Sequence, residues 1–194
     1  MMRCVFTWLV VATLLALSIQ AQAQVKPFKL QGAGVGPTGL PLPGQEARGH
    51  WASGEATHLG RHLAQGTLQT FSAVPDLANG RITGLFGSAS PFVFQAANGD
   101  KLVTWYGNTD HGATQPGTFE LTIVDVMPTG QLLVNAKWIA EFVVQPGDST
   151  GRFAGVTGSW VMYAQTTKPF LLPSTDPVHY SWQGEGRLLF PKAK

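Results

Sequence analysis

The segment Thr118–Val144 reads TFELTIVDVMPTGQLLVNAKWIAEFVV and decides the fold. In its first half, Phe119, Leu121 and Ile123 alternate with polar residues, and the second half largely repeats this alternation. Successive side chains of a strand point to opposite faces of a sheet, so this period of two predicts two half-buried strands. A Pro-Thr-Gly sequence ending at Gly130 separates them and predicts a hairpin turn.

The same pattern recurs along the chain, whereas helical periodicity is hard to find. Asn98-Gly99 suits the positive φ angles of a type I′ hairpin turn. Two segments rich in Gly or Pro, 37–45 and 168–177, are expected to be irregular. The fourth and fifth predicted strands are also compatible with one bent strand. We expect strands at residues 26–34, 48–59, 62–72, 81–88, 91–97, 100–107, 118–126, 132–144, 158–167 and 178–190.

Many short strands separated by turn signals predict an all-β protein, a sandwich or a barrel. A single antiparallel β-barrel of about eight strands is the fold we expect, because closure removes the exposed edges of an open sheet. The interior of such a barrel is either packed with side chains or holds one small ligand.

The amino-terminal residues have the features of a secretory signal peptide. Arg3 precedes an apolar run from Val5 to Leu17, and Ala21-Gln22-Ala23 follows. The run is shorter than the roughly 20 residues of a membrane-spanning helix, which disfavours an uncleaved anchor. We therefore expect a signal peptide at 1–23, cleavage after Ala23, and a single domain at 24–194 that is secreted or periplasmic and has no integral membrane span.

Composition excludes several kinds of site. The one cysteine of the chain, Cys4, lies in the expected signal peptide, so the mature chain has no disulfide or thiolate chemistry. The net charge is only +2 and the charges are scattered, so nucleic acid is a poor candidate partner. The sequence says nothing about the oligomeric state.

Three segments carry a resemblance to known proteins. Residues 54–60 read GEATHLG, residues 96–100 read AANGD, and residues 150–159 read TGRFAGVTGS. The first and third resemble signatures of a family of small secreted bacterial proteins of unknown function. The third is also similar to a Gly-rich stretch of allene oxide cyclase and dirigent proteins. This resemblance implies an eight-stranded antiparallel barrel of the allene oxide cyclase or calycin type, with ligands in its lumen.

The resemblance transfers no site residue, because no acidic or basic group of those barrels aligns with a position here. Glycine tolerates positive φ, so Gly151, Gly155 and Gly158 are expected to let the chain turn around Phe153. A phosphate-binding loop is excluded, because no helix follows and no Lys-Ser/Thr pair is present.

Motifs that carry chemistry are few. The sequence contains no G-x-S-x-G, H-E-x-x-H or S-x-x-K motif. Glu55, His58 and Tyr106 are the candidates for a catalytic group. His58 and His62 flank a predicted turn and are candidate metal ligands, although zinc requires three or four ligands. The alternative for His58 is a turn residue that hydrogen-bonds the backbone. No cofactor is expected.

Aromatic residues are the candidates for ligand contact. Tryptophans in predicted strands usually pack in the core, but one or two could line a pocket. The candidates for ligand binding are Trp105, Tyr106, Trp138, Trp160 and Trp182.

Three classes of function remain open. The first is non-enzymatic binding of a small apolar or amphipathic ligand. The second is a cofactor-free isomerase or cyclase acting in the lumen, and the third is a structural, envelope-associated barrel with a filled interior. A cavity of at least about 300 Å³ would support the first two. An inward-facing carboxylate or imidazole would favour the enzyme.

Overall fold

The computed structural model describes residues 24–192, so the expected signal peptide lies outside the described residues. The protein is all-β, with 63% strand and 5% helix. Its strands are β1 (Gln24–Gly36), β2 (Arg48–Ala56), β3 (Gly60–Asp76), β4 (Arg81–Ser88), β5 (Phe92–Ala96), β6 (Lys101–Tyr106), β7 (Gly117–Val126), β8 (Leu132–Val144), β9 (Thr157–Thr166), β10 (Phe170–Leu172) and β11 (Val178–Phe190). Three short 3₁₀ helices follow β3, β6 and β8: Leu77–Asn79, Thr109–His111 and Gly151–Phe153.

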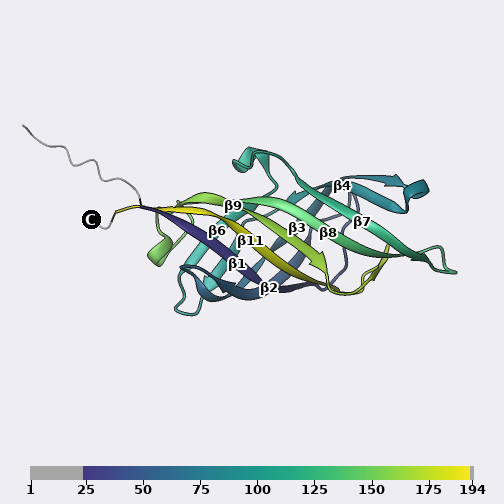
Figure 1. Cartoon of the computed structure of the whole chain (residues 1–194), viewed down its shortest axis with the longest axis horizontal. Helices are drawn as coiled ribbons and strands as arrows, with labels where there is room; N and C mark the ends of the chain where they lie inside the picture. The colour runs from purple at the N-terminus through teal and green to yellow at the C-terminus, as the bar shows by residue number, and fades with distance from the viewer. Residues whose placement is uncertain (1–23, 193–194) are drawn as a thin grey trace, which may run out of the picture.

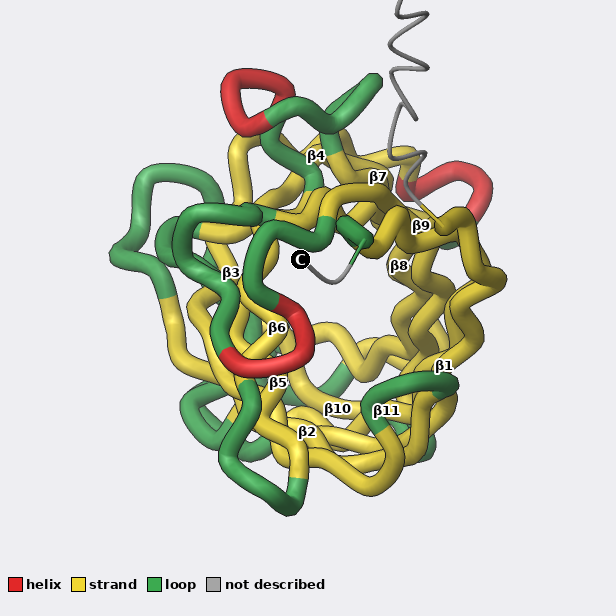
Figure 2. The backbone as a smooth tube through the Cα atoms, turned by 90° about the vertical axis from the view of Figure 1, so that its left-hand side faces the viewer, coloured by secondary structure: helices red, strands yellow, loops and turns green. Residues whose placement is uncertain are grey.

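Eight of these strands form a ring, which Figure 2 shows nearly end-on. The order is β2-β1-β11-β9-β8-β6-β5-β3, and β3 pairs with β2 to close it. Every pairing is antiparallel. The predicted barrel-like, all-β fold is therefore confirmed, with eight strands in the ring.

The remaining strands extend the sheet beyond the ring. Strands β4 and β7 form a bridge from β3 to β8, and both strands lie near the upper edge of Figure 1. Strand β4 pairs with β7 and β5 with β6, so the two are separate strands and not one bent strand. Among the described residues no helix is long and apolar enough to cross a membrane.

Both predicted hairpin turns form, but their type differs from the expected one. Gly99 has φ of 89° and Gly130 has φ of 82°, whereas Asn98 is not among the described non-glycine residues with positive φ. A type I′ turn needs two such residues, so the type I′ prediction is wrong. The hydrogen bonds from Gly99 N to Ala96 O and from Ala96 N to Asp100 O define a three-residue loop whose last residue is left-handed.

The segment expected to be irregular at 168–177 contains strand β10, which pairs with β8. Pro169 and Pro173 flank this strand, and the three residues between them retain their backbone N–H groups. Phe170 and Leu172 are buried and fix the strand on the core. The Gly-rich segment behaves as predicted, because Gly151 and Gly155 have positive φ around Phe153, whose side chain is completely buried.

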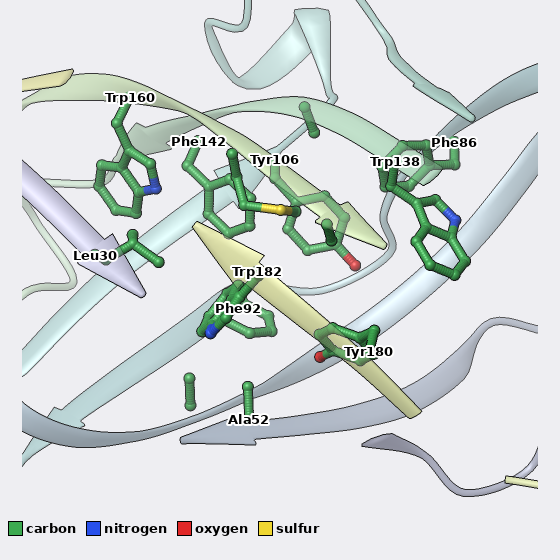
Figure 3. Close-up of a cluster of buried hydrophobic side chains, with 14 of the residues drawn as sticks. Leu30, Ala52, Phe86, Phe92, Tyr106, Trp138, Phe142, Trp160, Tyr180 and Trp182 are labelled. Atoms are coloured by element: carbon green, nitrogen blue, oxygen red, sulfur yellow. The ribbon is translucent and has the colours of Figure 1, made fainter. Parts of the chain in front are cut away.

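Aromatic side chains fill much of the ring. Figure 3 shows Trp160, Phe142 and Tyr106 in a row. The Phe142 ring is stacked on both of its neighbours, at centroid distances of 5.4 Å from Trp160 and 4.8 Å from Tyr106. Phe92 and Phe94 pack edge-on against Phe142. A well-packed aromatic cluster of this kind contributes much of the stability of a domain without disulfides.

The loop between β1 and β2 covers one end of the ring. Its residues Thr38–Gln45 form an apolar segment, here called the strap, in which Leu40 and Pro41 are buried. We call this end of the ring the strap end. The opposite end contains the turn around His58 and the 3₁₀ helix Gly151–Phe153, and we call it the signature end.

Candidate ligand-binding site

Strand β2 places His50 on the inner face of the ring. Gly49 and Trp51 alternate with His50 and Ala52, and Trp51 is 49% exposed whereas Ala52 is buried. The imidazole lies 4.9 Å from the ring of Phe92, measured between centroids. The alternation of β2 therefore brings a polar ring against the aromatic core.

Two tyrosine hydroxyls hold the imidazole from both sides. The Tyr106 hydroxyl donates to the carbonyl oxygen of Thr67 at 2.8 Å. His50 Nε2 lies 2.9 Å from the same hydroxyl oxygen, so Nε2 carries the proton and donates to Tyr106. Nδ1 is then the acceptor, and the Tyr180 hydroxyl donates to it at 2.8 Å. The result is one directed chain of hydrogen bonds, Tyr180 to His50 to Tyr106 to Thr67.

The three side chains of this hydrogen-bonded series, Tyr180, His50 and Tyr106, are uncharged at neutral pH. Burial lowers the pKa of His50 to about 4, because the desolvated imidazolium is disfavoured. Burial also raises the pKa of Tyr106 well above its usual value, with a smaller contribution from Tyr180. The pKa of Tyr180 is raised by burial as well. A fully paired, neutral polar chain is inexpensive to bury, which explains its presence beside the core.

A cavity of about 60 Å³ lies against this chain, at the strap end of the ring. Tyr106, Trp138, Tyr180 and Trp182 line it, and Figure 3 shows them as parts of one buried cluster. Leu40 and Pro41 of the strap form part of its wall. A cavity of this size exceeds the roughly 15 Å³ that one water requires, but not the 300 Å³ typical of a drug-sized ligand.

Two residues that line this cavity carry an indole N–H without a protein partner. Among residues 24–192, the buried indole N–H groups of Trp138 and Trp182 have no hydrogen-bond acceptor. The indole N–H of Trp160 shares this property farther from the strap. Within the same residues, His62 Nε2 is an acceptor without a donor, because Nδ1 donates to the carbonyl oxygen of Gly60. A buried donor without an acceptor costs about 1–3 kcal/mol. Neither the Trp138 nor the Trp182 nitrogen is accessible from the cavity, and that of Trp182 faces Gly32 of β1, so the cavity wall itself is largely apolar.

The structure brings together three of the five predicted ligand-binding residues, namely Tyr106, Trp138 and Trp182. Trp160 is buried against Phe142 and does not line this cavity. Trp105 lies on the opposite face of β6 from Tyr106, stacked on His111 at 3.6 Å between centroids. Adjacent strand residues point to opposite faces, so Trp105 cannot share the interior with Tyr106.

The other predicted catalytic and metal-binding residues lie elsewhere. Glu55 is exposed on the outer face of β2, in a shallow hollow of about 720 Å³. His58 has φ of 65° in the turn after β2, and its Nε2 lies 3.1 Å from the carbonyl oxygen of Pro27, which agrees with the turn interpretation.

His62 is buried against Phe94 and Trp182. Its Nδ1 lies 3.2 Å from the carbonyl oxygen of Gly60, and burial lowers its pKa. Within residues 24–192, no group of three or more His, Cys, Asp and Glu side chains could hold a metal ion.

The three segments that carry the family resemblance meet at the signature end. Arg152 donates to Asp100 at 2.8 Å and to the carbonyl oxygen of His58 at 3.2 Å. These contacts join the TGRFAG, AANGD and GEATHLG segments. Because Phe153 beside them is completely buried, the segments close this end of the ring and form no pocket with the site.

His50 is not among the candidate site residues predicted from the sequence. The signal was present, because alternation puts His50 in line with Ala52 and Gly54 on one face of β2. On that face His50 is the one large polar ring among small residues. The sequence does not reveal the registers of β2 and β11 on β1. These registers bring the Tyr180 hydroxyl within hydrogen-bond distance of His50.

The fold and site together define a single-ring, antiparallel β protein with a small apolar cavity and a neutral His–Tyr chain. Comparisons with known proteins add no family: no protein-family model matches the chain, and no curated protein or solved structure is significantly similar to it.

Proposed function

We propose that this protein binds a small amphipathic ligand without transforming it, with the polar end of the ligand beside His50. The observation that carries the proposal is the largely apolar cavity beside the uncharged hydrogen-bonded chain of Tyr180, His50 and Tyr106. An alcohol can donate a hydrogen bond to the Tyr180 hydroxyl oxygen, and it brings no charge into this largely apolar site.

The protonation states favour binding over catalysis. An inward-facing imidazole is the feature that would suggest an enzyme, but a general base works best with a pKa near the operating pH. His50 has a pKa of about 4, and both of its nitrogens are occupied by tyrosines. The tyrosines, with raised pKa values, are poor acids. A cofactor-free isomerase therefore has weaker support.

A structural role is the second candidate, because the signature half of the ring is filled. Phe28, Phe94 and Trp160 pack there with the rings in contact, at 4.6 Å between the centroids of Phe28 and Trp160. A protein whose only task is to resist unfolding needs no cavity. The cavity beside His50, at about 60 Å³, is smaller than the roughly 300 Å³ expected of a lumenal ligand site, so it supports only a very small ligand, and the structural role stays the second candidate.

We also propose that the protein is exported, with the first 23 residues removed as a signal peptide. Expression of the full-length chain in a Gram-negative host, followed by fractionation and amino-terminal sequencing, tests this. The expected product begins at Gln24 in the periplasm or medium. A product that retains Arg3, or that stays in the membrane fraction, would contradict export.

The binding proposal is tested by titrating ¹⁵N-labelled protein with 1-propanol. Binding is monitored through the NMR resonances of the indole N–H groups. We expect the resonances of Trp138 and Trp182 to shift on titration, while that of exposed Trp51 stays unchanged. His50→Phe removes the imidazole that orients the Tyr106 and Tyr180 hydroxyls beside the cavity and should weaken binding about fivefold, the equivalent of one hydrogen bond. His179→Phe, at an exposed position of β11, is the matched control. Equal affinities for both variants would contradict the proposal.

A further inference from the structure

The cavity beside His50 has a larger apolar neighbour. A crevice of about 190 Å³ lies between the strap and the inner face of the β3–β4–β7 extension. No charged residue lines it. Its walls are formed by Leu40, Pro41, Leu42, Pro43, Thr70, Ala73, Pro75, Ile82, Phe119, Leu121 and Leu172. An engineered apolar cavity of about 150 Å³ binds benzene, so this crevice has room for about six carbon atoms.

The strap lies between the two spaces. Leu40 and Pro41 line both the crevice and the cavity beside His50. If the strap moves outward, Leu40 and Pro41 vacate the volume they occupy between the two spaces. The cavity and the crevice then form one elongated site. That site has the neutral His50 chain at one end and an apolar wall along the rest.

The sequence of the strap suits such a movement. Leu40-Pro41-Leu42-Pro43 contains two prolines, whose fixed φ angles make the segment stiff. Gly39 and Gly44 bracket it, with φ of 76° and 79°. Hinges are a few loop residues that absorb the change in backbone angles. A stiff segment between two glycines can therefore swing as a unit.

Few polar contacts hold the strap in place. The Thr70 hydroxyl donates to the carbonyl oxygen of Pro41 at 2.6 Å. The Arg48 guanidinium donates to the carbonyl oxygen of Thr38, to that of Ser174 at 3.4 Å, and to Gln45 Oε1 at 3.1 Å. The strap itself has no ladder of backbone hydrogen bonds to a strand. Its release therefore requires the loss of a small number of interactions.

We propose that the ligand is a single alkyl chain with an uncharged polar head, and that the strap opens to admit it. The head lies beside His50 and the chain extends into the crevice. Because no charged residue lines the crevice, and because Arg48, the one charged residue that lines the cavity, also donates to the carbonyl oxygen of Ser174 outside the strap, an uncharged head is preferred to a charged one. The inference rests on the proposed ligand-binding function.

The length of the ligand's alkyl chain tests the inference on the unaltered protein. We expect the affinity for primary alcohols to rise about fourfold for each methylene from 1-propanol onward, the transfer value for one buried CH₂, and to level off once the crevice is full. 1-Octanol should bind more tightly than octanoate or octylamine. Affinity that does not depend on chain length, or tighter binding of octanoate or octylamine, would overturn the proposed ligand class.

Two variants test the crevice and the strap. Ala73→Leu fills the crevice and should weaken 1-octanol binding about tenfold or more, while 1-propanol, which needs only the His50 end, binds as before. Thr70→Val removes the hydroxyl that holds Pro41 and should raise the association rate of 1-octanol severalfold. Thr83→Val, exposed on the neighbouring strand, is its control and should leave the rate unchanged. Far-ultraviolet circular dichroism confirms that each variant is folded.

The outcomes separate the two proposals. If 1-propanol shifts the resonances of Trp138 and Trp182 but Ala73→Leu leaves 1-octanol affinity unchanged, the crevice inference is wrong and the proposed binding at His50 stands. An association rate of Thr70→Val equal to that of Thr83→Val would overturn the opening of the strap. If no alcohol shifts these resonances, the binding function itself fails.

Discussion

At the scale of single residues, His50 shows how burial and hydrogen bonding fix a protonation state. Its two nitrogens face two tyrosine hydroxyls, and the order of donors leaves Nε2 protonated and Nδ1 as acceptor. A second proton on Nδ1 would meet the hydrogen of Tyr180 and would place a charge beside Phe92. The imidazole therefore acts as a neutral connector between strands β2, β6 and β11.

This arrangement predicts a pH dependence of stability. In the unfolded chain His50 binds a proton near pH 6.5, whereas in the folded protein it does so only near pH 4. Between these values acid favours the unfolded state, so the stabilising contribution is complete above pH 6.5 and falls as the pH approaches 4. The loss amounts to about 3 kcal/mol. Urea unfolding from pH 4 to 7.5 measures it.

The variant His50→Gln should lack this part of the pH dependence, because its side chain does not titrate. His179→Gln removes an exposed imidazole and should keep the full dependence. Buried His62 also has a lowered pKa and adds a slope of the same sign to both variants. The difference between the variants therefore isolates His50, and parallel curves would show that the His50 imidazole is not held neutral.

At the scale of elements, the turns decide where strands end. Gly99 and Gly130 each occupy the last position of a three-residue hairpin loop with positive φ. The sequence predicted a turn at both places, because Asn-Gly and Pro-Thr-Gly combine residues that favour turns. It could not predict the turn type, which depends on whether Asn98 also has positive φ.

The turn geometry predicts a backbone effect without a steric one. No side chain lies near Gly99, so Gly99→Ala creates no clash, yet its φ of 89° disfavours any residue with a Cβ. We expect a loss of about 1–2 kcal/mol in unfolding free energy. Gly147, equally unobstructed but not among the glycines with positive φ, is the control: Gly147→Ala should change stability by no more than about 1 kcal/mol. Equal effects in thermal unfolding would rule out this explanation.

Strand positions were largely predictable because alternation is a local property. The two runs around Gly130 gave β7 and β8 nearly to the residue. Strand β10 was missed, because three residues between prolines are too few to show a period, and their pairing with β8 is a long-range contact. The same limit applies to the site. Tyr106 was identifiable as a tyrosine on a strand, but His50 lies 56 residues from Tyr106 and 130 residues from Tyr180 along the sequence.

At the scale of the whole molecule, the ring has two unlike halves. The signature half is closed by Arg152, Asp100 and buried Phe153, and its interior is packed with aromatic rings. The strap half retains a cavity and a crevice. A packed half makes the framework stable, so the other half can carry space that by itself would cost stability. This division is the physical basis for the proposed binding site in a domain without disulfides.

The division predicts where stability resides. Phe142 is completely buried and touches rings from four other strands, including Phe92 of β5, Tyr106 of β6 and Trp160 of β9. Phe142→Ala should therefore cost about 3–5 kcal/mol, since the rings around it cannot all collapse into the space. Tyr163→Ala, at a 50% exposed aromatic on β9, should cost about 1 kcal/mol or less. Urea unfolding of both variants compares them. A small cost for Phe142→Ala would mean that the ring interior is loosely packed throughout, and that the strap half is no more open than the rest.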